Sequence, residues 1–159
     1  MFSGPDPEGR LDELQDELRR AQAVTPDLIS MTIAAACTRI TTQSGATWAA
    51  RVKRLTELEA WTEAALVLVE RELPQWKLRR LVYEEGAWLC SLSKQWNLPA
   101  WLGDCAEARH ESLPLAILSA LIEARQCGEP PFAPMASSVP QCGFKAGSAV
   151  EIVCCDNFA

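Results

Sequence analysis

The chain of 159 residues contains no long apolar run and no excess of basic residues. A membrane-spanning helix needs roughly 20 consecutive apolar residues, and no stretch approaches that length. The formal net charge of -6 repels phosphate backbones at long range, so general binding to DNA or RNA is disfavoured. Residues 1–9 have neither a basic start nor an apolar run, so no secretory signal peptide is expected there. We therefore expect a cytoplasmic protein that does not enter a membrane.

Motifs for cofactors and metals are also missing. Neither G-x-x-x-x-G-K nor G-x-G-x-x-G occurs, so no phosphate-cradling loop is expected. Structural zinc sites usually pair their ligands at a spacing such as C-x₂-C, and the only close cysteines are the adjacent Cys154 and Cys155. Neighbouring side chains of an extended segment point to opposite faces, which separates these two thiols. The sequence predicts neither a metal site nor a cofactor.

The seven cysteines are odd in number and scattered along the chain, a pattern typical of reduced thiols in the cytosol. A thiol-dependent enzyme would need a base beside its thiol, and His110 is the one histidine. Cys105 lies five residues before it, in an expected loop. We assign no catalytic residue, and Cys105 with His110 is the alternative that this spacing leaves open.

Proline and glycine divide the chain into three parts. Residues 1–9 hold two of each and no periodicity, which predicts a disordered tail. Residues 10–128 carry helical and strand periodicities and are predicted to form a single α+β domain. Residues 129–159 contain prolines and cysteines in linker-like composition, which predicts a second tail.

The first expected helix begins near Arg10. Its apolar residues Leu11, Leu14 and Leu18 follow a three-four spacing, with charged residues on the other faces. Such a helix docks on a core. The alternative is a dimerisation seam formed by the same three leucines with a second copy of the chain, although two heptads are short for a coiled coil.

Three further helical segments are indicated. Thr25-Pro26-Asp27 is a strong helix start, and Ser44-Gly45 provides a stop for the helix that follows. The pattern is helical again up to Leu73, with a division expected near Thr56 because Thr56 and Glu59 have the capping-box spacing. The last helix is predicted after Ser112, and its buried stripe comprises Ile117, Leu118, Leu121 and Ile122.

Between these helices the apolar period changes to two. Residues 76–83 and 87–93 alternate apolar and polar side chains around Glu84-Glu85-Gly86, which predicts a β-hairpin. The core of the domain is therefore a helix, β-hairpin, helix unit over residues 56–126, with helices layered on a small sheet. Residues 94–110 show no sustained period and are expected to form a long loop.

One group of residues suggests a binding surface. Trp76, Lys77 and Arg79 combine an aromatic ring with basic side chains at the start of the hairpin, and the loop adds Trp96 and Trp101. Stacking rings beside cations are typical of single-stranded nucleic-acid sites. This binding function is an alternative that the negative net charge opposes.

The segments Trp76-x-Leu78, Gly86-x-Trp88 and Pro114-Leu115-Ala116-Ile117, in this order of elements, resemble the phage ABA-sandwich family and related small uncharacterised bacterial proteins. The resemblance implies a small layered α/β domain of phage-derived ancestry and assigns no functional residue. We therefore predict a non-enzymatic interaction or accessory protein. A nucleic-acid-binding module and a thiol-dependent enzyme are the alternatives.

Overall fold

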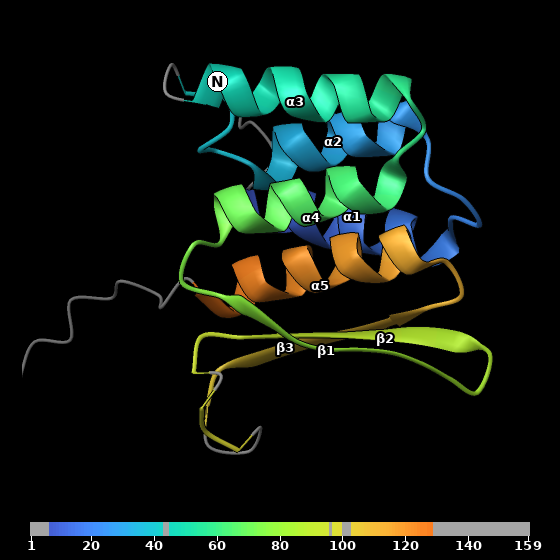
Figure 1. The fold of residues 1–159 in the computed structure, drawn as a ribbon, viewed down its shortest axis with the longest axis vertical. Helices are drawn as coiled ribbons and strands as arrows, with labels where there is room; N and C mark the ends of the chain where they lie inside the picture. The colour runs from blue at the N-terminus through green and yellow to red at the C-terminus, as the bar shows by residue number, and fades with distance from the viewer. Residues whose placement is uncertain (1–6, 43–44, 96, 100–102, 129–159) are drawn as a thin grey trace, which may run out of the picture.

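A computed structural model describes residues 7–42, 45–95, 97–99 and 103–128 of the protein. These residues form an α+β fold of five helices and one three-stranded antiparallel sheet (Figure 1). The elements follow in the order α1 (Pro7–Arg20), α2 (Pro26–Ala36), α3 (Ala46–Glu57), α4 (Trp61–Glu72), β1 (Lys77–Glu84), β2 (Ala87–Ser93), β3 (Cys105–His110) and α5 (Leu113–Gly128).

All five helices lie on one side of the sheet (Figure 1). Helix α5 packs on β2 and β3, α1 and α4 pack on α5, and α2 and α3 lie farthest from the sheet. From Leu115 to Ala124 every residue of α5 except Glu123 is buried. A helix that is apolar on all its faces belongs in the centre of a protein, because it has no face to give to water. The four leucine and isoleucine residues predicted as its stripe are all fully buried.

The sheet has the order β1-β2-β3, with both pairs antiparallel. The predicted hairpin is present, and its two-residue turn places Glu85 and Gly86 at positive φ, which suits the twist of a tight hairpin. The prediction of one long loop over residues 94–110 was wrong, because its last six residues form β3. In that strand Ala106 and Ala108 pair with Leu92 and Cys90 and join the core beneath α5.

Two predictions about the N-terminal part need correction. Helix α1 begins at Pro7, so residues 7–9 belong to the fold and not to the predicted tail. Leu14 is 2% exposed and Leu18 is 0% exposed, and both belong to the hydrophobic core that includes α5, while Leu11 is partly buried against it. These leucines therefore pack against the core of their own chain and are not free to form a dimerisation seam with a second copy. The second tail, with Cys154 and Cys155, lies outside the described residues.

The predicted start of α2 is confirmed, since the Leu28 N–H donates to the Thr25 hydroxyl at 3.2 Å. The helix ends earlier than predicted, at Ala36. Helices α3 and α4 are divided as expected, but the N-cap of α4 is Ala60, four residues later than the expected cap at Thr56. Thr56 lies in the last turn of α3, where its hydroxyl donates to the Val52 carbonyl, and the chain reverses at Glu59 with a positive φ.

The connection from α2 to α3 is held by a buried carboxylate. Glu72, the last residue of α4, is 2% exposed and accepts the backbone N–H groups of Arg39 at 3.0 Å and Ile40 at 2.7 Å. Gly45 approaches the same turn so closely that a Cβ atom there would overlap the carbonyl oxygens of Arg39 and Ile40. Both contacts fix where the chain turns before α3 begins.

Candidate functional site

The thiol and imidazole considered for catalysis are not brought together. Cys105 begins β3 and His110 ends it, and at the usual rise per residue the two lie about 16 Å apart with side chains on opposite faces. The Cys105 Sγ lies 3.2 Å from the Ser91 hydroxyl, while His110 Nδ1 accepts the Ser112 N–H at 2.9 Å. Each group thus has a local partner, and no thiol–imidazole pair forms.

The other described thiols lie in surroundings that disfavour the thiolate. Burial, with a further contribution from the Glu72 carboxylate, raises the pKa of Cys37 far above its ordinary range. Burial alone raises the pKa of Cys90 to about 12, and burial is also the main cause of the raised pKa of Cys127. Nucleophilic cysteines need a lowered pKa. Among the described residues, no group of three histidine, cysteine or acidic side chains is arranged to hold a metal ion.

Of the five residues predicted to bind single strands, the structure describes Trp76, Lys77 and Arg79, and it gives them different surroundings. Trp76 is only 6% exposed and packs in the core, with the Lys94 ammonium 5.1 Å from the centre of its ring. Lys77 is exposed, and Arg79 donates from Nη1 to the Leu98 carbonyl at 2.6 Å. A β-bulge at Arg79 leaves Arg80 as the residue opposite Ser91. Trp96 and Trp101 lie outside the described residues.

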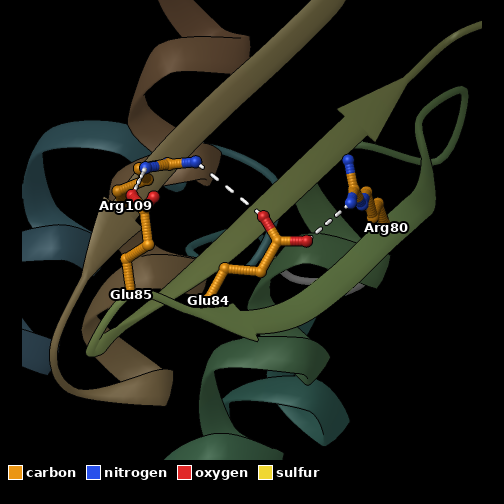
Figure 2. Close-up of polar contacts among 4 residues, drawn as sticks. All are labelled: Arg80, Glu84, Glu85 and Arg109. Atoms are coloured by element: carbon orange, nitrogen blue, oxygen red, sulfur yellow. Dashed lines mark hydrogen bonds and ion pairs between the residues drawn. The ribbon is translucent and has the colours of Figure 1, made fainter.

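The sheet face away from α5 carries paired charges. Figure 2 shows Glu84 between two arginines: its carboxylate lies 2.8 Å from Arg80 Nη2 and 4.0 Å from Arg109 Nη2. Arg109 also reaches the Glu85 carboxylate at 3.8 Å. Arg80, Glu84 and Arg109 are about half exposed and Glu85 is 86% exposed, so the pairs add little stability. They do balance the charge of this face, which makes it a poor platform for a polyanion.

The clearest candidate site is an apolar groove between α2 and α3, with a volume of about 630 Å³. Helix α2 packs on α1 and α3 packs on α4, but within the described residues α2 and α3 make almost no contact with each other. Both helices lie at the end of the molecule opposite the sheet (Figure 1), and the groove lies between them. We call it the α2–α3 groove. Its apolar floor and walls are formed by Ile29, Ile33, Ile40, Ala46, Ala49 and Val52.

The groove owes its shape to small residues on one wall and to the turn on its floor. Ala46 and Ala49 are exposed and lie one helical turn apart on α3. Because their side chains are single methyl groups, they project little from the α3 backbone into the groove. Ile40 is placed in the floor by the bond that its N–H gives to Glu72. Two charged side chains line the groove, Lys53 and Glu57, both exposed on α3.

The periodicity of the sequence identifies the core stripes of these helices, but it does not indicate that α2 and α3 stay apart. The exposed alanines of α3 were the one available signal, because they interrupt an otherwise charged face. The groove was therefore missed from the sequence alone.

No helix in the described part of the chain is both long and apolar enough to cross a membrane. In comparisons with known proteins, no protein-family model, no curated protein and no solved structure matches this chain.

Proposed function

We propose that the protein is a non-enzymatic interaction protein whose α2–α3 groove receives an amphipathic helix of a partner protein. The observation that carries the proposal is the hollow between α2 and α3, which is lined by the exposed Ala46 and Ala49 and the partly buried Ile33, with Ile29, Ile40 and Val52 buried beneath them. Large apolar hollows on a protein surface usually mark binding sites, because an apolar partner that fills one removes apolar surface from contact with water, which is favourable. The raised thiol pKa values and the separation of Cys105 from His110 support a binding role over a catalytic one.

The form of the groove favours a helix as its occupant. Its walls are two helices, and on α2 the apolar residues Ile29 and Ile33 follow one another at the four-residue spacing of a helix face. A third helix with apolar residues at the same spacing would lie along them, which is the helix-in-groove mode of recognition. The low alanine wall allows its backbone to come close to α3.

The charged residues at the groove indicate which charged side chains a partner helix should carry. Lys53 and Glu57 lie four residues apart on α3 and carry opposite signs. A complementary helix therefore presents an acidic side chain opposite Lys53 and a basic one opposite Glu57, about one turn apart. Such paired charges set the orientation of the partner more than its affinity.

The resemblance to phage ABA-sandwich proteins adds a proposal about origin, namely an accessory protein of phage-derived ancestry. It rests on the segments around Trp76, Gly86 and Pro114. Location in a reducing compartment such as the cytosol is proposed from Cys37, Cys90, Cys105 and Cys127, which are all free thiols.

The test uses two alanines of α3 that are both exposed but differ in position. Ala49 lines the groove, whereas Ala50 does not. A photo-crosslinking amino acid placed at either position in the host cell reports what lies there. We expect a discrete adduct from position 49 alone, and the cross-linked partner segment should have an amphipathic helical pattern.

A synthetic peptide of that segment then gives the affinity. Ala49→Glu places a charge in the groove and should weaken peptide binding at least tenfold, while Ala50→Glu, with the same change in helix propensity, should leave it within twofold. Equal adducts from both positions, an adduct with a small apolar molecule or a second copy of this chain, or equal affinities of the two variants would each overturn the proposal.

A further inference from the structure

A second pocket lies at the corner where α4, α5 and the strand ends meet, and it is lined by charged groups. Its volume is about 310 Å³. The lining includes Arg39 from the turn after α2, Glu72 at the end of α4, Lys94 after β2 and Arg125 in the last turns of α5, with the Trp76 ring beside them. We call it the corner pocket. Four separate segments of the chain therefore meet at this one hollow.

The positive charges of the corner pocket are not neutralised by its carboxylate. Both oxygens of Glu72 are occupied by the backbone N–H groups of Arg39 and Ile40. Among the described residues, the guanidinium groups of Arg39 and Arg125 have no ion-pair partner. Lys94 pairs with Asp104 at 3.3 Å, and Asp104 is 60% exposed and does not line the pocket. With Asp104 counted beside Lys94, three cations and two carboxylates leave a local excess of one positive charge, which the two arginines hold against Glu72.

A purely structural role accounts for only part of this arrangement. Arg125 lies near the negative end of α5, where a cation stabilises the helix. Lys94 is accounted for by its contacts with Asp104 and the Trp76 ring. Arg39 lies in the turn after α2 and has no such explanation. In a chain with a net charge of -6, cations gathered around a pocket indicate an anionic ligand.

We infer that the corner pocket binds the phosphate group of a small molecule. A phosphate is an anion at neutral pH, and guanidinium groups bind its oxygens in a bidentate manner, so the two arginines without ion-pair partners suit it. Lys94 is already held by Trp76 and Asp104, so little of its side-chain freedom is left to lose on binding. The volume lies at the lower end of the range for small-molecule sites, roughly 300–1,000 Å³, which suits a small phosphate monoester.

Nuclear magnetic resonance titrations of the folded full chain test this inference. The probes are inorganic phosphate, glycerol 3-phosphate and acetate at constant ionic strength. We expect saturable shifts of the Trp76 indole N–H and the Gln75 backbone amide with both phosphates, and at least tenfold weaker binding of acetate. Tighter binding of the monoester than of inorganic phosphate would identify an organic phosphate as the ligand, and equal binding would identify free phosphate.

Charge-matched variants provide the control. Arg39→Gln and Arg125→Gln should each weaken phosphate binding at least tenfold, while Arg54→Gln, an exposed arginine on α3 that does not line the pocket, should change it less than twofold. Equal losses in all three variants would show a general charge effect and overturn the inference. Shifts that do not saturate, or acetate binding as tight as phosphate binding, would overturn it as well.

Discussion

Replacing Glu72 by alanine should destabilise the protein strongly, because this buried carboxylate is the shared acceptor of two backbone N–H groups. A buried donor left without a partner costs about 1–3 kcal/mol. The Ile40 N–H is buried and the Arg39 N–H is partly buried, so Glu72→Ala should lower the free energy of unfolding by about 2–5 kcal/mol. Domains are typically stable by about 5–15 kcal/mol, so the loss would be a large fraction of the total.

Urea unfolding followed by far-ultraviolet circular dichroism measures this change. Glu72→Gln keeps the size of the side chain and one accepting oxygen, so about half of the loss is expected. Glu70→Ala is the matched control on the same helix, since Glu70 is exposed, and it should change stability by no more than about 0.5 kcal/mol. A Glu72→Ala protein as stable as the control would refute the role given to this carboxylate. Amide hydrogen exchange at Ile40 should accelerate in the alanine variant even below the unfolding transition.

Three further predictions concern the backbone, a thiol and the core. Gly45→Ala should destabilise the fold because its Cβ would overlap carbonyl oxygens, whereas Gly9→Ala, an exposed helical position with open space, should stabilise it by about 0.5–1 kcal/mol in thermal unfolding. Burial raises the pKa of Cys90 to about 12, so the thiol ionises first in the unfolded chain. Stability is therefore retained below about pH 8.5 and lost as pH rises from there toward 12, and Cys90→Ala should reduce that decline by about 1.4 kcal/mol per pH unit. An identical alkaline decline in both proteins would contradict it. Leu18→Ala should cost about 2–5 kcal/mol and leave the mass in sedimentation equilibrium unchanged, whereas a lower mass would revive the dimerisation seam.

Local signals in the sequence predicted the parts of the fold that local chemistry decides. Thr25 and Pro26 mark a helix start by their own side chains, and the capping bond confirms it. The buried stripe of α5 and the hairpin turn were predicted for similar reasons, since the spacing of apolar residues and the turn residues can both be read from neighbouring positions in the sequence. What these elements share is that no distant part of the chain is needed to explain them.

The missed features depend on distant contacts. In β3, Ala106 and Ala108 alternate with Glu107 and Arg109, but alanine favours helices over strands, and only the cover given by α5 makes these small side chains suitable. The reversal at Glu59 requires a positive φ that its residue type does not indicate. Neither candidate site is visible locally, because each is formed by segments that are separated in the sequence.

The central position of α5 also constrains the order in which the chain can acquire its structure during synthesis. This helix is the last described element, yet the sheet covers one side of it and α1 and α4 cover the other. Gln126 at its end donates to Asp12 near the start of the chain at 2.9 Å. Until residues 113–124 have left the ribosome, the faces of α1, α4 and the sheet that contact α5 have nothing to cover them. The nascent chain must therefore keep those faces exposed until α5 emerges, and the part of the core around α5 closes only then.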